Sequence, residues 1–173
     1  FFTDKEIDLG ALQATNPVLR AAEVPQREPR TLTCIVDRNG PVKLSFFVVP
    51  GVFNPLREPH RAPDNGLRVA SVIDLAATKV KVVCDRAEVK DYLDVDAILR
   101  LTDISLGEAL AAARMVYGSA FAPLPSLKAL SYFGDGNLDQ LPADVKQRLT
   151  KAVQAVDPNR LPSLTRIRPT ERP

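Results

Sequence analysis

The chain has 173 residues, of which 45% are hydrophobic and 25% are charged, and its formal net charge is +2. This size and composition predict a soluble globular protein with one ordinary domain or two small subdomains sharing a core. They argue against a membrane protein, because no apolar run approaches the roughly 20 residues of a spanning helix. They also argue against nucleic-acid binding by bulk charge alone.

Cysteine and histidine chemistry is not expected. The two cysteines, Cys34 and Cys84, lie in apolar runs and are interpreted as buried, reduced thiols of a cytoplasmic protein. With a single histidine, His60, a zinc site of the Cys/His kind cannot be assembled. The first residues, FFTDKE, show no basic leader or cleavage pattern, so no secretory signal is predicted.

The first third of the chain is predicted to be rich in strands. A short helix is expected at residues 4–13, capped by Thr3 and ended by Asn16 before a proline. TLTCIV and VKLSFFVV flank DRNGP, and two such runs around an Asn-Gly pair predict a β-hairpin. An earlier run, VLRAAEV, is a candidate third strand. Residues 50–66 are rich in proline and predict an irregular connector.

The remainder is predicted to be helical. Ser71 with Asp74, and Ser105 with Glu108, match capping boxes that open two helices. LPSLKALSYF and PADVKQRLTKAVQAV predict two more, and the tail from Asp157 is expected to be extended or disordered. The sequence therefore predicts an α+β fold in three parts: a strand-rich part at 1–66, a helical region at 67–156 and a basic, proline-rich tail at 157–173.

Lys79 stands out on the first long helix. At about 100° per residue, it falls near the middle of an apolar arc formed by Val72, Leu75, Ala76, Val80, Val82 and Val83. Burying an unpaired ammonium group costs several kcal/mol, so this amine must reach water, lose its proton or meet an anion. Two interpretations stay open: a lysine that reaches solvent or makes a structural ion pair, and a lysine that faces phosphate.

The next helix carries two carboxylates on one face, because Asp91 and Asp94 are three residues apart. Two i, i+4 ion pairs worth a few tenths of a kcal/mol each are expected on it: Lys90 with Asp94, and Asp96 with Arg100. Asp91 has no such local partner. The spacing permits a cleft in which Lys79 holds triphosphate oxygens and Asp91 orients or deprotonates an attacking hydroxyl.

At these residues the sequence resembles the AbiEii/AbiGii-type nucleotidyltransferase toxins, a branch of the polymerase β-like nucleotidyltransferase superfamily. The family's D-x-x-x-x-K element is present as Asp74 and Lys79. Its R-x-x-x-K-D-x-x-D element is present as Arg86, Lys90, Asp91 and Asp94. VKLSFF, LRVASVIDLAATK and LKALSYF also look like family segments, and the likeness runs from Phe1 to about Phe133.

The resemblance implies a reaction and a set of roles. The reaction is transfer of a nucleotidyl group from a nucleoside triphosphate, with Mg²⁺, to an acceptor that in some members is tRNA, and the toxin is paired with an antitoxin. Lys79 would contact the phosphates, and Asp91 or Asp94 would activate the acceptor hydroxyl. The remaining motif residues would bind nucleotide and hold these carboxylates, or give structural support: Arg86 and Lys90 in the first role, Asp74 in the second.

The resemblance also implies what is missing. The family's glycine-rich phosphate turn and its metal-binding D-x-D precede the point where Phe1 stands, and Ser45 is the only polar uncharged residue where a third carboxylate is expected. We therefore expect no Mg²⁺ ligands in this chain and an inactive fragment with weak nucleotide binding. An unpaired sheet edge and uncovered apolar faces around Phe1, Phe2, Phe46 and Phe47 favour a homodimer.

Two other functions compete with this one. The chain could be a non-catalytic module that binds an antitoxin or RNA through the four arginines of its tail, which are Arg160, Arg166, Arg168 and Arg172. It could also be a structural α+β domain whose charged cluster is a network of salt bridges.

Overall fold

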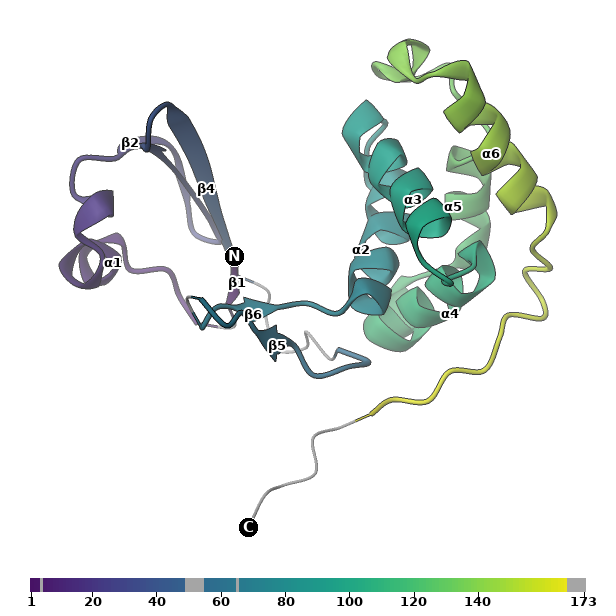
Figure 1. The fold of residues 1–173 in the computed structure, drawn as a ribbon, viewed down its shortest axis with the longest axis horizontal. Helices are drawn as coiled ribbons and strands as arrows, with labels where there is room; N and C mark the ends of the chain where they lie inside the picture. The colour runs from purple at the N-terminus through teal and green to yellow at the C-terminus, as the bar shows by residue number, and fades with distance from the viewer. Residues whose placement is uncertain (4, 49–54, 65, 168–173) are drawn as a thin grey trace. The chain divides into compact units, whose positions relative to one another are not determined.

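A computed structural model describes residues 1–3, 5–48, 55–64 and 66–167. The chain forms two compact units, Phe1–Phe53 and Asn54–Pro173, which are described separately below (Figure 1). A mixed four-stranded sheet lies in the first unit and most of the helices lie in the second, so the α+β fold class is confirmed. The helical unit begins before residue 66 because Leu56 is completely buried in its core.

The first unit is built on a sheet with the strand order β1-β4-β3-β2. Its strands are β1 (Phe2–Thr3), β2 (Glu23–Glu28), β3 (Thr31–Asp37) and β4 (Pro41–Val48). Strand β1 runs parallel to β4, and the other neighbours are antiparallel. The predicted hairpin is confirmed as β3–β4, since Asn39 and Gly40 supply the two positive φ angles of its turn, 61° and 133°.

The predicted first helix is shorter than expected. Helix α1 spans Leu9–Thr15, and its N-cap is Asp8, whose Oδ1 accepts a hydrogen bond from the Ala11 N–H. Thr3 is not the cap, because it belongs to β1. Asn16 ends the helix as predicted.

VLRAAEV does not form a strand throughout. Its first residues lie in a 3₁₀ turn, Pro17–Leu19, because a proline at the first position fixes a helical φ, and β2 starts only at Glu23. Leu19 from this turn joins the small core of the unit with three side chains of β3, which are Leu32, Cys34 and Val36.

The outer edge of β4 is paired over two positions, Phe2 with Phe47 and Thr3 with Val48. Phe1, Phe2 and Phe47 are exposed, which agrees with the uncovered aromatic surface that was expected. Phe46 is an exception, because it is partly buried against the core of this unit and stacks on Phe1 with 5.0 Å between ring centroids. The homodimer through this edge stays a prediction.

The second unit is a bundle of helices preceded by a small hairpin (Figure 1). The hairpin pairs β5 (His60–Arg61) with β6 (Arg68–Val69). The helices are α2 (Val72–Asp85), α3 (Val89–Leu101), α4 (Leu106–Tyr117), α5 (Pro123–Ala129) and α6 (Ala143–Gln154). Within the described residues, no helix is long and apolar enough to cross a membrane.

Small residues allow the central helices to approach closely. On α4, Ala109, Ala112 and Ala113 are buried in the core, and Ala76 and Ala77 of α2 are buried in the same cluster. The capping box that opens α4 is confirmed, because Ser105 and Glu108 exchange both hydrogen bonds. These local signals therefore define where the helices start.

The tail is extended, and through Ile167 it belongs to the helical unit (Figure 1). Leu161 and Leu164 pack against the core. The Ile167 N–H donates to the Leu56 carbonyl at 2.9 Å, and Arg166 donates from Nη2 to the Met115 carbonyl at 2.9 Å. Of the four tail arginines, two lie outside the described residues, Arg168 and Arg172.

A loop of the second unit supports the start of α3. The Asn137 Oδ1 accepts a hydrogen bond from the Val89 N–H at 2.9 Å and so caps α3 from a distant segment. Next to it, Gly136 has a φ of 58°, and a Cβ at this position would lie 2.0 Å from the Ala87 carbonyl oxygen. Only glycine fits this close approach.

Replacing Gly136 with alanine is expected to lower the free energy of unfolding by about 2–4 kcal/mol, from backbone strain and from the collision with Ala87. Chemical denaturation measures this loss. Gly118→Ala is the matched control, because Gly118 also has a φ of 58° but no described atom lies within 4 Å of its added Cβ. Equal losses in the two variants would show that the collision is relieved without cost.

Candidate functional site

The buried face of α2 is rotated from the one the apolar arc predicts. Its buried apolar residues are Ala76, Ala77, Val80 and Val83. Val72 and Leu75, which were expected in the core, are 46% and 42% exposed. The small alanines, rather than the larger Val72 and Leu75, face the core because α4 packs closely there. Lys79 therefore lies at the flank of the buried face rather than at its centre.

Lys79 meets two carboxylates of α3. Helices α2 and α3 are joined by only three residues, 86–88, so they are neighbours in the bundle. The Lys79 Nζ lies 3.1 Å from Asp91 Oδ1 and 2.5 Å from Asp94 Oδ2, and its side chain is 21% exposed. Burial alone would lower the pKa of Lys79, but the hydrogen bonds to Asp94 and Asp91 raise it above its ordinary value. The amine is therefore charged and paired.

Asp91 is the buried centre of this cluster. Its side chain is 0% exposed, and its second oxygen, Oδ2, accepts a hydrogen bond from Arg86 Nε at 2.8 Å. It also lies in the first turn of α3, where the helix dipole favours a negative charge. Burial raises the pKa of Asp91, but the bonds from Arg86 and Lys79 outweigh that effect and hold the pKa below its usual range. Asp91 is therefore a firmly ionised carboxylate.

Asp94 is the accessible member. Its side chain is 49% exposed, and it forms an ion pair with Lys79. The structure thus brings four of the predicted site residues into one cluster, which we call the Lys79 cluster: Lys79, Arg86, Asp91 and Asp94.

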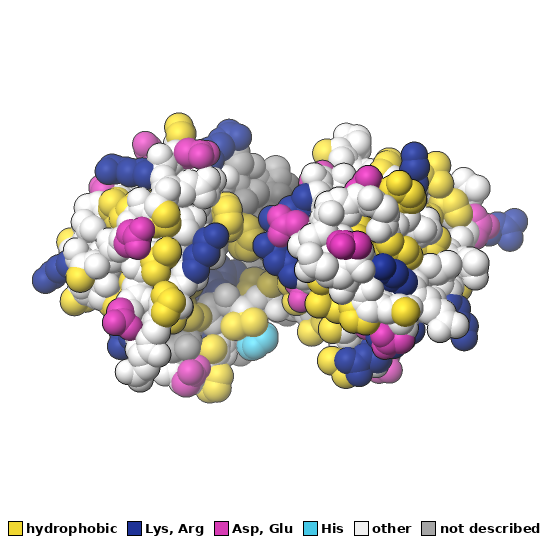
Figure 2. Space-filling model, turned by 90° about the horizontal axis from the view of Figure 1, so that it is seen from above, with side chains coloured by type: hydrophobic (Ala, Val, Ile, Leu, Met, Phe, Trp, Pro, Cys, Tyr) yellow, Lys and Arg dark blue, Asp and Glu magenta, His cyan; other side chains and the backbone are white. Residues whose placement is uncertain are grey.

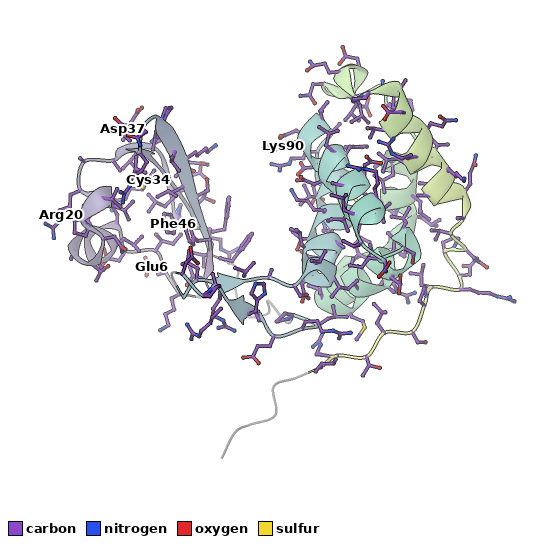
Figure 3. All side chains as sticks on the ribbon, in the orientation of Figure 1. Glu6, Arg20, Cys34, Asp37, Phe46 and Lys90 are labelled. Atoms are coloured by element: carbon purple, nitrogen blue, oxygen red, sulfur yellow. The ribbon has the colours of Figure 1, made fainter. Side chains whose placement is uncertain are left out.

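Lys90 does not join the Lys79 cluster. Its Nζ pairs with Glu88 Oε2 at 2.6 Å, and the side chain projects from the start of α3 toward solvent (Figure 3). The predicted pair of Lys90 with Asp94 is wrong, because Lys79 from the neighbouring helix takes Asp94 instead. The motif pattern also missed Glu88, which lies between two cations in the sequence and contacts both in the structure.

The second predicted i, i+4 pair on α3 is also replaced by a tertiary one. Asp96 is bound by Arg148 of α6 through two hydrogen bonds of 2.7 and 2.8 Å rather than by Arg100. A guanidinium group that binds both carboxylate oxygens forms a stronger interaction than an exposed pair on one helix. This bond holds α6 on the back of α3, away from the Lys79 cluster.

Asp74 lies outside the Lys79 cluster and has more than a capping role. It is 1% exposed, and its carboxylate accepts hydrogen bonds from the Leu56 N–H at 2.7 Å, the Arg57 N–H at 3.1 Å and the Ser71 hydroxyl at 2.6 Å. Its own N–H donates to Ser71 Oγ, which caps α2. Asp74 therefore fastens the segment at 55–57 to the start of the helix that carries Lys79.

The carboxylates of the Lys79 cluster do not fit Mg²⁺. Both Asp91 oxygens and one Asp94 oxygen are engaged by the two cations, and within the described residues no group of three or more His, Cys, Asp or Glu side chains could hold a metal ion. A hard divalent cation needs several free oxygen ligands. The Lys79 cluster as it stands therefore offers no set of free oxygen ligands for Mg²⁺.

Comparison with known proteins places the chain in a family. A family model described as "Nucleotidyl transferase AbiEii toxin, Type IV TA system" matches residues 13–167, which is most of the chain and includes every residue of the Lys79 cluster. No curated protein and no solved structure gave a significant match. The resemblance is thereby confirmed: the chain belongs to the nucleotidyl transferase AbiEii toxin family of type IV toxin–antitoxin systems.

Proposed function

We propose that this chain binds a nucleoside triphosphate at the Lys79 cluster and serves transfer of a nucleotidyl group to an acceptor, with the 3′ end of tRNA as the candidate acceptor. It acts in the cytoplasm, and a cognate antitoxin restrains it. One observation carries the proposal: a charged lysine, 21% exposed, is held between a buried carboxylate and an accessible one. All residues of the Lys79 cluster lie within residues 13–167, the range that the family model matches.

The two carboxylates have different roles in this proposal. Asp91 keeps its bonds to Arg86 and Lys79, so it positions the ammonium group. A carboxylate whose pKa is held low is a poor proton acceptor, so Asp91 is a positioning residue. Triphosphate oxygens displace Asp94 from Lys79, because Asp94 is the accessible partner.

The displaced Asp94 carboxylate accepts the proton of the acceptor hydroxyl. The hydroxyl oxygen attacks the α-phosphorus, a new P–O ester bond forms, the α–β anhydride bond breaks, and pyrophosphate leaves with the electron pair of that bond. Lys79 stabilises the negative charge on the phosphate oxygens during this displacement. The chain's own contribution is therefore positioning, charge stabilisation and removal of one proton.

Lys79→Ala tests the proposal. We expect its affinity for nucleoside triphosphates, measured by calorimetry with and without Mg²⁺, to fall at least about tenfold, because a charge-assisted contact to phosphate is lost. Transfer of an α-labelled nucleotide to tRNA is expected to be slow even in the unchanged chain, because the Lys79 cluster offers no Mg²⁺ ligands, and it should fall by about a further 100-fold in this variant.

Lys81→Ala is the matched control. Lys81 lies on the same helix and pairs with Asp85 at 2.7 Å on the surface, outside the Lys79 cluster. It should bind and transfer as the unchanged protein does. The proposal is wrong if the unchanged chain binds none of the four nucleoside triphosphates, or if both lysine variants bind them equally well.

A further inference from the structure

The side chains of the β5–β6 hairpin contribute little to the packing of the protein. Of the described residues from His60 to Ala70, all but Ala62 are exposed, and none belongs to either core cluster. Backbone hydrogen bonds close the hairpin, such as the one from the Ala62 N–H to the Leu67 carbonyl at 2.8 Å. A two-stranded hairpin with no core of its own is marginally stable. The exposed arginine side chains of this hairpin are therefore available for binding rather than needed for packing.

Two arginines lie directly opposite each other in this hairpin. Arg61 pairs with Arg68 across the strands, which places their Cβ atoms about 5 Å apart. Among the described residues, neither guanidinium has a carboxylate within ion-pair distance, and Arg61 donates only to the Gly66 carbonyl at 3.3 Å. Like charges at opposed positions destabilise a strand pair. An anion between or beside them would remove that repulsion.

Two more side chains with N–H donors adjoin the pair. His60 precedes Arg61 on the exposed strand, and the chain's one histidine lies at the surface in Figure 2. Arg57 is half-buried nearby in the chain, where Nη1 is tied to the Thr165 carbonyl at 2.6 Å. The remaining donors of its guanidinium group extend the basic stretch toward residue 57.

We propose that the β5–β6 hairpin is an arm that binds phosphates of the nucleic-acid acceptor, with Arg61 and Arg68 as the two phosphate ligands. The inference rests on the proposed function, because that function requires an acceptor chain to lie near Lys79. Guanidinium groups suit phosphate because they donate two parallel hydrogen bonds to it. Because Arg61 and Arg68 face each other at one cross-strand position, the two groups are close enough to contact neighbouring phosphates of one nucleic-acid strand.

The arm and the Lys79 cluster belong to one continuous stretch of chain. Strand β6 ends at Val69 and α2 begins at Val72, so only two residues separate them. Lys79 lies seven residues beyond Val72, which is about 10 Å along the helix axis. An acceptor whose end reaches Lys79 is therefore within a few nucleotides of the hairpin. This proximity favours a nucleic acid over other polyanions.

The test compares two double variants of the whole chain. Arg61→Ala/Arg68→Ala removes the arm, and Arg38→Ala/Arg100→Ala removes two exposed arginines elsewhere as the control. Binding of fluorescent tRNA is measured by anisotropy from 50 to 200 mM KCl. The arm variant should bind at least about tenfold more weakly at the lowest salt, and its slope of log K against log[KCl] should be shallower by about 1.4–1.8, as expected for two lost phosphate contacts. The control should keep both values.

The following results would overturn or support the proposal that the hairpin binds nucleic-acid phosphates. An unchanged slope in the arm variant, or the same loss in the control, overturns the proposal. Displacement of tRNA by polyglutamate as effectively as by an equally charged RNA also overturns it, since the arm would then recognise acidic protein. Arg61→Lys/Arg68→Lys should keep the salt slope, because both charges remain. Unchanged thermal unfolding of the arm variant shows that it is folded.

The experiments distinguish a failure of the proposed function at Lys79 from a failure of the proposed phosphate-binding arm. If Lys79→Ala binds nucleoside triphosphates normally while the arm variant loses tRNA, the proposed function fails and the arm stands. If Lys79→Ala loses nucleotide while the arm variant keeps its tRNA affinity, the arm fails and the proposed function stands.

Discussion

Replacing Asp91 with alanine is expected to lower the free energy of unfolding by about 3 kcal/mol, which is measurable by urea denaturation at pH 7. The carboxylate is completely buried and binds Lys79 and Arg86, so its removal leaves two cations without their shared anion. Breaking a buried pair costs about 3–5 kcal/mol. We expect a value at the lower end of this range, because the Lys79 and Arg86 side chains are partly exposed and can be hydrated when Asp91 is absent.

Asp94→Ala is the control for this prediction. Asp94 binds the same lysine, but its side chain is half-exposed, so the loss should stay below about 1 kcal/mol. Similar losses in the two variants would mean that burial does not distinguish the two carboxylates.

Asp91 should also make stability depend on pH in a definite direction. Its pKa in the folded protein is lower than in the unfolded chain, where it is about 3.9. The folded state therefore binds fewer protons at this group, and the contribution is fully present above the unfolded pKa and is lost as the pH falls through the folded pKa. The difference between the unchanged protein and Asp91→Ala should shrink below about pH 4. A constant difference down to pH 3 would contradict this assignment.

Replacing Asp74 with alanine is expected to cost about 3–4 kcal/mol in chemical denaturation. Two backbone N–H groups, those of Leu56 and Arg57, lose their acceptor, and each buried donor left unpaired costs about 1–3 kcal/mol. This loss of stability comes from the broken hydrogen bonds between the segment at 55–57 and the start of α2. Asp74→Asn keeps one acceptor oxygen and should lose about half as much.

Glu108→Ala provides the comparison for Asp74. Glu108 is at the same position of a capping pattern on α4, but its carboxylate accepts only from Ser105, near the surface. Its removal should cost about 1 kcal/mol. If Asp74→Ala costs no more than Glu108→Ala, the bonds to the 55–57 segment do not stabilise the fold.

The sequence by itself determined features that depend on near neighbours in the chain. The Asn-Gly turn of β3–β4 follows from two residues that adopt positive φ, and the capping box of α4 follows from Ser105 and Glu108. Local information also singled out Lys79, because an ammonium group on a mostly apolar helix face must reach water, lose its proton or meet an anion. Which of these it does was left open by the sequence. Asp91 was the carboxylate without a local partner, and it is one of the two carboxylates that bind this lysine.

The choice among alternative partners was decided only by the tertiary structure. Local pairing favoured Lys90 for Asp94 and Arg100 for Asp96, but each local pair is worth only a few tenths of a kcal/mol. Packing of α2 and α6 against α3 instead supplied Lys79, which also binds the buried Asp91, and Arg148, which binds both oxygens of the buried Asp96. Close packing of alanines likewise rotated α2 and left Leu75 at the surface, because contact between whole helices outweighs the periodicity of one.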